Sequence, residues 1–450
     1  MIKNNNTHHQ LHLTILGAGP AGLSTGYYAK AAGIPFTIFE SEARIGGNCI
    51  THRRGDFLFD SGAHRLHDRD PEITADYLDI LENDVHEVSR TSYIFDNGKL
   101  IMFPLNPFDL LIKLNKRKLF KFFLDIIRSR IALGNGSSFR DFAIKKYGSS
   151  LASSFLLNYS EKLWGLSADK LSPMIAGKRL NGLGLSNAIL NLFTSSLKSK
   201  RHMEGKFYYP ATGIGLLSDR LGVICGTDNI RLSSRITKMH HDNNRIFSIE
   251  INDEKRIPVN HIVSSLPVTL FLDALSPSPD NLLIDIQHKL RYRNLVLVAL
   301  FINKPSITDG ATLYFPGKDI NFTRVYEPRN RCHLMSPEGN TSLVAEIPCS
   351  EDDEIWISDK KSITRSAIEN LTDAGLITPA DVIGSAVERL RYAYPILEKD
   401  YFIYMEKAEQ YLSRFSNLTY IGRNGRFTYS WIHDQMRSAK DAIKLIKEET

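Results

Sequence analysis

The sequence has few cysteines, and none of them occurs in a pattern that would make it structural. The 450 residues include four, which are Cys49, Cys225, Cys332 and Cys349, and no Cys-x-x-Cys pair is present. This wide spacing argues against a zinc site and against a disulfide framework, and it suits a reducing compartment. We therefore predict a cytoplasmic protein with no bound metal.

Long apolar runs are also absent. No uninterrupted apolar stretch approaches the roughly 18–20 residues of a membrane-spanning helix. The first ten residues, MIKNNNTHHQ, are polar, so we expect no signal peptide. Residues 108–131 differ from the rest because Leu, Ile and Phe alternate there with Lys and Arg. They predict either an amphipathic helix with one buried and one solvated face, or peripheral contact with an anionic membrane.

The chain carries no large excess of charge of either sign. Its 56 basic and 50 acidic residues leave a net charge of +6, with 42% hydrophobic and 24% charged residues. This composition is ordinary for a globular protein of two or three structural units, and it lacks the dense basic signature of nucleic-acid binders. We expect no nucleic-acid partner. The mild positive charge suits an anionic cofactor and an anionic substrate.

The clearest feature that is present is a glycine-rich turn near the N-terminus. Gly17, Gly19 and Gly22 form the pattern G-x-G-x-x-G between an apolar run and a predicted helix over 23–32. Such glycines allow a tight turn, a close approach to a diphosphate and close packing of helix on strand. Glu40 ends the next predicted strand, eighteen residues after Gly22, where an acid binds a ribose hydroxyl. The pattern predicts dinucleotide binding, against the alternative of a chance glycine turn with a surface acid.

The continuation to residue 64 resembles the N-terminal signature of large FAD flavoenzymes: the amine oxidases, protoporphyrinogen oxidases and UDP-galactopyranose mutases. In those families the second glycine pair wraps the FAD diphosphate, and a segment like FDSGAH reaches the isoalloxazine. No cysteine near the C-terminus offers covalent attachment, so the resemblance implies FAD held non-covalently. It assigns to the cofactor Gly17, Gly19, Pro20, Ala21, Gly22, Glu40, Ser41, Arg44, Gly46, Gly47, Asn48, Gly62, Ala63, His64, Ile236, Gly422 and Arg423.

Pieces of this pattern recur far apart in the chain, which predicts a discontinuous domain. The expected fold class is α/β, with a Rossmann-like FAD-binding domain and an inserted mixed α+β substrate domain. The FAD-binding domain is predicted from residues 10–80, 205–270 and 415–447, and the substrate domain from 85–200 and 275–410. We expect 85–200 to be mostly helical and 275–410 to mix strands and helices.

The substrate side resembles the UDP-galactopyranose mutases more specifically. The segment NYSEKLWGL has Tyr, Lys and Trp at the family's spacing, with an arginine following, and the stretches near 313–330, 392–395 and 422–434 also match. The resemblance implies catalytic roles for His64, Arg324 and Tyr429, and substrate contacts for Tyr159, Trp164, Arg179, Tyr314 and Tyr394. Taken singly, each of these residues has an ordinary structural explanation, so the prediction depends on the set occurring in family order.

The function predicted from these motifs is that of an FAD-dependent oxidoreductase acting on a small molecule that is anionic or lipid-linked. The alternative is a redox-neutral mutase in which reduced flavin is the nucleophile, and a third reading is a flavin-stabilised scaffold. The mutases differ at FPLN (103–106) and SWIHDQ (430–435), so we expect no efficient turnover of UDP-galactofuranose. Amine oxidation is disfavoured, because the sequence shows no aromatic cage.

Overall fold

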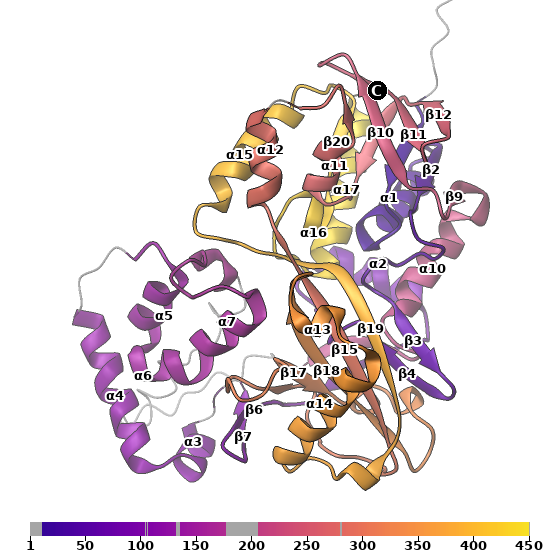
Figure 1. Ribbon diagram of the computed structural model, residues 1–450. Helices are drawn as coiled ribbons and strands as arrows, with labels where there is room; N and C mark the ends of the chain where they lie inside the picture. The colour runs from indigo at the N-terminus through magenta and orange to yellow at the C-terminus, as the bar shows by residue number, and fades with distance from the viewer. Residues whose placement is uncertain are drawn as a thin grey trace, which may run out of the picture.

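The computed structural model describes residues 11–103, 105, 107–131, 136–176, 206–279 and 281–449. Figure 1 shows a parallel sheet with its helices, a larger mixed sheet beside it, and a separate group of helices on one flank. The last helix of the described chain, α17, packs against α1, the first helix.

A five-stranded sheet, all parallel, forms the first layer, in the order β20-β13-β1-β2-β9. Its strands are β1 (Leu13–Leu16), β2 (Phe36–Phe39), β9 (Ile230–Arg231), β13 (His261–Ser264) and β20 (Leu418–Tyr420). Helices α1 (Pro20–Ala31), α2 (Pro71–Leu81), α10 (Gly215–Cys225) and α17 (Ile432–Glu448) pack around it. The strand β1 is buried along its whole length, which explains its unbroken apolar sequence LTIL. The predicted α/β fold class is confirmed.

Three segments far apart in the sequence therefore supply one sheet. A smaller sheet in the order β12-β11-β10-β14 lies next to it. Its strands are β10 (Ile236–His241), β11 (Ile246–Ile251), β12 (Lys255–Pro258) and β14 (Leu275–Ser276). The antiparallel pair β10–β11 turns at Asn243, whose φ is 72°, as expected of an Asp-Asn-Asn hairpin.

A seven-stranded sheet forms the other large layer, in the order β19-β15-β18-β17-β16-β6-β7. Its strands are β6 (Ser92–Asp96), β7 (Lys99–Phe103), β15 (Tyr292–Ile302), β16 (Leu313–Tyr314), β17 (Arg324–Tyr326), β18 (Thr341–Cys349) and β19 (Val382–Pro395). The expectation that 85–200 is mostly helical is wrong at its start, where β5 (Val85–Ser89), β6 and β7 lie. The turn Asn97-Gly98, with φ of 49° and 78°, is the hairpin signal that explains the difference.

The flanking helical group follows β7 in the chain. It comprises α3 (Pro107–Lys113), α4 (Lys116–Ile131), α5 (Phe139–Tyr147), α6 (Ser149–Ala152), a π-helical stretch (Ser153–Leu157) and α7 (Asn158–Trp164). The remaining α-helices and strands are β3 (Thr51–Arg54), β4 (Phe57–Asp60), β8 (Lys206–Pro210), α11 (Val268–Asp273), α12 (Asn281–Lys289), α13 (Glu354–Ile357), α14 (Lys360–Asp373), α15 (Tyr401–Leu412) and α16 (Gly422–Gly425). The domain boundaries given above stay a prediction.

Candidate active site

A cavity of about 1520 Å³ opens where the parallel sheet, the mixed sheet and the helical group meet. Ligand pockets in proteins commonly measure about 300–1,000 Å³. The larger volume leaves room for a dinucleotide and a second molecule together. Its walls come from the glycine turns at one end and from aromatic and arginine side chains of the mixed sheet and α7 at the other.

The glycine turn at the start of α1 faces this cavity. Gly19 is the N-cap residue of α1, and it makes no side-chain cap bond, while the first turn of the helix contains no acid. A Cβ added to Gly19 would have nothing within 4 Å, and one added to Gly47 would lie 3.2 Å from the Gly19 Cα. The two glycine turns thus approach each other at the positive end of a helix dipole. This arrangement fits a diphosphate.

The acid at the end of β2 is held firmly in place. The Glu40 Oε2 accepts a hydrogen bond from the Ala18 N–H at 2.7 Å, and Oε1 accepts from the Glu42 N–H at 2.9 Å and the Ser41 Oγ at 3.1 Å. A carboxylate has about four acceptor sites, so one stays available. Glu40 and Ser41 both line the cavity, where that site suits a ribose hydroxyl.

Three of the residues assigned to the cofactor do not reach the cavity. Gly22 packs beneath the turn, because a Cβ there would lie 1.8 Å from the Gly17 carbonyl oxygen. Gly46 has a φ of +96°, and a Cβ there would lie 2.6 Å from the Ile50 side chain. Ile236 packs against the apolar core beside the β10 sheet and is not among the lining residues, so the structure does not bring it to the cavity.

The other assigned residues do line the cavity. They are Gly17, Gly19, Pro20, Ala21, Glu40, Ser41, Arg44, Gly47, Asn48, Gly62, Ala63, His64, Gly422 and Arg423. Arg44 braces the second turn, because its Nη1 donates to the Gly47 carbonyl at 2.9 Å. Gly422, with a φ of +79°, lies so close to α1 that a Cβ there would be 3.0 Å from the Ala21 Cβ.

The loop that carries His64 is anchored by a buried charged group. The Asp60 carboxylate accepts from the Tyr209 hydroxyl at 2.6 Å and lies 3.8 Å from Arg331 Nη1, which donates to the His64 carbonyl at 3.2 Å. The His64 Nε2 donates to the Asn48 carbonyl at 3.0 Å, so the proton of the neutral ring is on Nε2. Burial, reinforced by the positive charges of Arg423, Arg324 and Arg331, lowers the pKa of His64 to about 3.

This depressed pKa predicts a loss of stability in mild acid. In the unfolded chain, His64 binds a proton when the pH falls below its ordinary pKa of 6.5. In the folded protein it binds that proton only near pH 3. The stabilising contribution is therefore present above pH 6.5 and is lost as the pH falls toward 3. In His64→Gln, which keeps a donor for the Asn48 carbonyl, the free energy of unfolding should fall less steeply between pH 6 and 4 than in the wild type. The two slopes should differ by about 1.4 kcal/mol per pH unit.

Chemical denaturation of apoprotein at several pH values measures this slope. His333 is exposed, and His333→Gln is the control that should match the wild type. Equal slopes for wild type and His64→Gln would contradict a neutral, buried His64.

At the opposite end of the cavity, Arg324 is held by two partners. Its Nε donates to the Glu346 Oε2 at 2.5 Å, and its Nη2 donates to the Tyr394 hydroxyl at 2.9 Å. The other carboxylate oxygen of Glu346 accepts from the Ala63 N–H at 2.7 Å. One buried carboxylate thus joins the arginine to the His64 loop. The Nη1 of Arg324 has no hydrogen-bond partner in the described part of the chain, and Arg324 lines the cavity.

Aromatic side chains surround this arginine. The rings of Tyr394 and Tyr429 are nearly parallel, at 21° with centroids 6.2 Å apart. Trp164 meets them edge-on, at 6.0 Å and 6.2 Å. Three aromatic rings thus lie together, with Tyr394 and Tyr429 as a nearly parallel aromatic pair and Trp164 of α7 against their edges. However, the Arg423 guanidinium lies 5.3 Å from the Tyr429 ring centre, so a substrate ammonium would meet like charge here.

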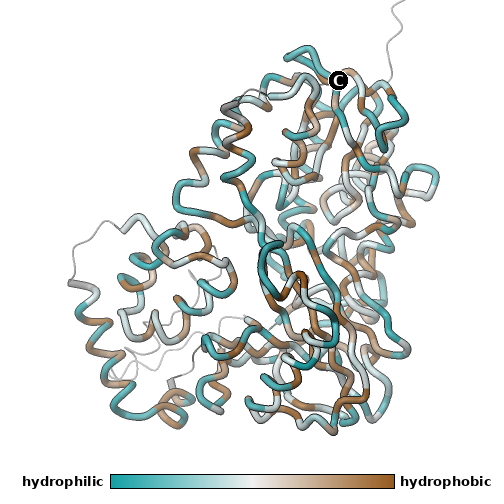
Figure 2. The backbone as a smooth tube through the Cα atoms, viewed as in Figure 1, coloured by the Kyte–Doolittle hydropathy of each residue, from teal (hydrophilic) through white to brown (hydrophobic). Residues whose placement is uncertain are grey.

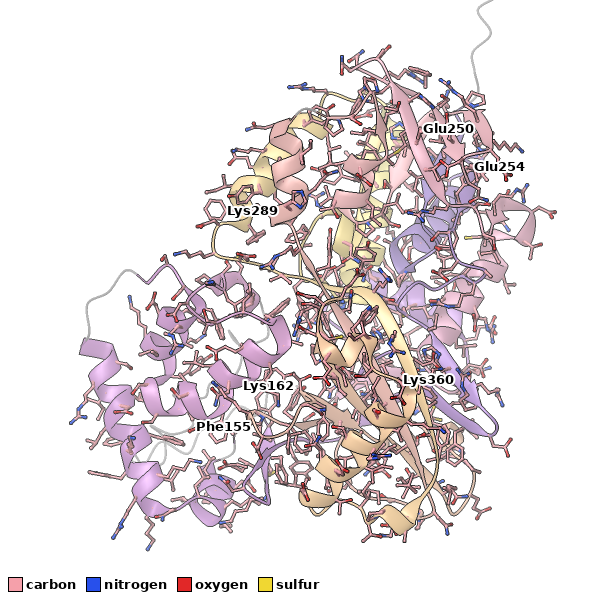
Figure 3. All side chains as sticks on the ribbon, viewed as in Figure 1. Phe155, Lys162, Glu250, Glu254, Lys289 and Lys360 are labelled. Carbon is pink, nitrogen blue, oxygen red and sulfur yellow. The ribbon has the colours of Figure 1, made fainter. Side chains whose placement is uncertain are left out.

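Tyr159 and Tyr314 line the apolar end of the cavity, with ring centroids 5.8 Å apart. Arg179 lies outside the described residues. Lys162, although part of the matched motif, does not line the cavity. Its Nζ donates to the carbonyls of residues 315, 317 and 322 at 2.7–2.9 Å, and burial lowers its pKa to about 8. Figure 3 shows Lys162 on the helical group where it faces the mixed sheet, so it braces a loop there.

The sequence analysis missed Glu346, Asp60 and Arg331. Glu346 is the single charged residue of β18, TSLVAEIPC, a strand that is buried at every position. Such a lone acid in an apolar strand is costly unless it is paired, and this is the signal that could have identified it. Asp60 and Arg331 offered no comparable signal, because their pairing joins residues 271 positions apart in the sequence.

The parallel sheet, the glycine turns and the cavity beside them are typical of a dinucleotide-binding domain. The family model described as "Flavin containing amine oxidoreductase" matches residues 20–373. The chain belongs to this family of flavin-dependent oxidoreductases, as the sequence motifs predicted.

Individual relatives match smaller parts or match in fold alone. The Arabidopsis thaliana protoporphyrinogen oxidase 2 is 32% identical over 101 residues, which span 22% of this chain and 20% of that protein. L-amino acid oxidase Cdc18 of Crotalus durissus cumanensis is 40% identical over 60 residues, 13% of this chain and 12% of that protein. The fold is similar to that of reduced UDP-galactopyranose mutase, with a TM-score of 0.85, 18% identity, and coverage of 98% of this chain and 96% of that one. A putrescine oxidase variant has a TM-score of 0.69, 14% identity, and coverage of 98% and 100%.

Proposed function

We propose that the protein is an oxidoreductase that binds FAD non-covalently and acts on a small anionic substrate. The observation that carries the proposal is Arg324, which lines the cavity, is fixed by Glu346 and Tyr394, and has no hydrogen-bond partner for Nη1 among the described residues. A guanidinium held this way is prepared to bind a carboxylate or phosphate at little entropic cost. The nearby Arg423 favours an anion over an amine for the same electrostatic reason.

The choice of FAD rests on which residues line the cavity. It runs from Glu40, suited to a ribose, past the glycine turns to His64 and the aromatic pair. Cys49 is the cysteine that lines it among the described residues, and burial raises the pKa of its thiol to about 12. A protonated thiol is a poor nucleophile, so covalent attachment is not expected. Bound flavin would accept the hydride, while the protein positions the substrate and excludes water.

The substrate also has an apolar part in this proposal. Beyond Tyr159 and Tyr314 the cavity is lined by Ile94, Phe103, Phe155 and Leu156. Figure 3 shows Phe155 on the helical group, where it faces the mixed sheet. An anionic head at Arg324 and a chain along these side chains would use both parts of the cavity.

A redox-neutral mutase is the second candidate, favoured by the similarity of fold along the whole chain to UDP-galactopyranose mutase. In that function Arg324 would hold the leaving diphosphate. The two candidates differ in whether electrons leave the substrate, and this difference can be measured.

We expect an anionic amphiphile to bleach the flavin absorbance under anaerobic conditions, and an electron acceptor to restore it. The assay mixes the holoenzyme with a panel of amphiphilic acids and with the amines of equal chain length. In parallel, UDP-galactofuranose and UDP-galactopyranose are incubated with oxidised and with dithionite-reduced enzyme. Interconversion by reduced enzyme would establish the mutase. Bleaching by the amines and not by the acids would contradict the anionic substrate.

A further inference from the structure

The outer side of α3 and α4 exposes large apolar side chains. The exposed fractions are Phe108 61%, Leu111 49%, Ile112 83%, Phe120 56% and Ile127 38%. In α3 they occur at i, i+3 and i+4, and in α4 they are seven residues apart, so each set lies on one face of its helix. Figure 1 places both helices at the edge of the helical group, and Figure 2 shows hydrophobic and hydrophilic residues alternating along them.

Within the described residues, Leu111, Ile112, Phe120 and Ile127 belong to none of the buried apolar clusters. The opposite face of the same two helices already supplies a complete buried face. It consists of Leu110, Leu119, Phe122 and Ile126, which pack with Leu114 between the helices and with β6, β7 and the π-helical stretch. An ordinary amphipathic helix of a globular protein has one apolar face. The helices α3 and α4 have a second one, and solvent-facing apolar surface of this extent marks an interaction site.

The charge between these apolar side chains is of one sign. Lys116, Arg117, Lys121 and Arg128 are all exposed. Both acids of the segment have partners within the protein. Asp109 pairs with Lys113 at 2.8 Å and accepts a hydrogen bond from the Met102 N–H. Asp125 accepts hydrogen bonds from Ser149 and Ser150. Within the described part of the chain, Lys116, Arg117 and Arg128 form no salt bridge.

We propose that the outer face of α3 and α4 docks on the surface of an anionic lipid bilayer. The apolar side chains would enter the boundary between headgroups and acyl chains, and the cations would lie beside the lipid phosphates. A second copy of the chain is disfavoured as the occupant, because two such faces would bring like charges together. None of the helices in the described residues is long and apolar enough to cross a bilayer, so the contact is peripheral.

The docking face and the apolar end of the cavity are two sides of one core. Phe155 and Leu156 pack in the cluster that holds α3 and α4, and both line the cavity. A membrane-derived amphiphile would suit this arrangement. That connection rests on the proposed function, whereas docking itself depends only on the exposed face.

Co-sedimentation of the full-length holoenzyme with vesicles tests the docking. We expect binding to vesicles of equal phosphatidylcholine and phosphatidylglycerol, weaker binding to phosphatidylcholine alone, and a decrease in high salt because surface charges are screened. The double variant I112D/F120D should lower the partition coefficient roughly tenfold or more. The control is Val223→Asp, which places one aspartate on α10, where Val223 is 76% exposed, and is compared with the single variants I112D and F120D.

Thermal melting and flavin content show that each variant is folded, since the substituted positions are exposed. Absence of binding by the wild type, or an equal loss in Val223→Asp, would overturn the proposal. So would a dimer that I112D/F120D dissociates, because the face would then join two copies. Turnover of soluble substrates is measured separately without vesicles, so a failure of the proposed chemistry is distinguishable from a failure of docking.

Discussion

Gly19→Val is expected to give a folded but colourless protein. The φ of Gly19 is −76°, which any residue adopts, and a Cβ there meets nothing within 4 Å. The apoprotein should therefore lose little stability, less than about 1 kcal/mol. The added side chain would occupy the space where a diphosphate approaches the α1 N-terminus. Losing two charge-assisted hydrogen bonds of about 1.5–3 kcal/mol each would weaken FAD binding by roughly 10²–10⁴-fold.

The measurement compares flavin absorbance after purification, the dissociation constant of FAD with apoprotein, and thermal melting of the apoproteins. Wild-type protein should be yellow and should release FAD into the supernatant on acid precipitation. The matched variant is Gly22→Ala, in which the Cβ would lie 1.8 Å from the Gly17 carbonyl oxygen. It should lose both stability and FAD. Normal FAD affinity in Gly19→Val would refute the placement of the diphosphate.

Arg324→Ala is expected to weaken binding of the anionic substrate by about 1.5–3 kcal/mol, roughly 10–150-fold, because a charge-assisted hydrogen bond is lost. It should also destabilise the protein by about 3–5 kcal/mol. Glu346, with 1% of its side chain exposed, would lose the cation that compensates its buried charge. Substrate titration of the holoenzyme and denaturant unfolding measure the two effects.

Two further variants separate binding from stability. R324A/E346Q removes the unpaired charge while an amide oxygen can still accept from the Ala63 N–H, so stability should recover and affinity should not. Arg324→Lys keeps the positive charge but cannot hold Glu346 and Tyr394 together, so we expect intermediate affinity. If Arg324→Ala binds the true substrate as the wild type does, Arg324 is a structural residue, and the substrate class must be reassigned.

The cofactor end of the site follows closely from sequence, because its determinants are local. The Gly17 turn, the first turn of α1 and Glu40 lie within 24 residues, and a strand, a turn, a helix and a second strand in that order allow few arrangements. Gly22 and Gly46 allow the two glycine turns to pack closely, and neither residue lines the cavity. This difference depends on which direction each Cβ would point, and the spacing of residues does not determine that direction.

The mixed sheet shows where sequence reasoning was insufficient. The dipeptide Asn97-Gly98 is a sequence signal for a hairpin, but it lies in a segment that was expected to be helical. The position of Arg324 directly across from Glu346 could not be predicted from the sequence, because it depends on the register between β17 and β18. A shift of one residue would turn Glu346 to the other face of the sheet.

The sequence by itself predicted a flavin cofactor and the parallel layer of the fold, because a glycine turn, a helix N-terminus and an acid act through neighbouring backbone. The tertiary structure decided the substrate end. Arg324, Tyr394 and Trp164 come from three separate elements and Tyr429 from the segment between α16 and α17, and their meeting depends on long-range strand pairing and core packing. It also decided the nature of residues 108–131. The buried and exposed faces of α3 and α4 are distinguished only when the core they pack against is present.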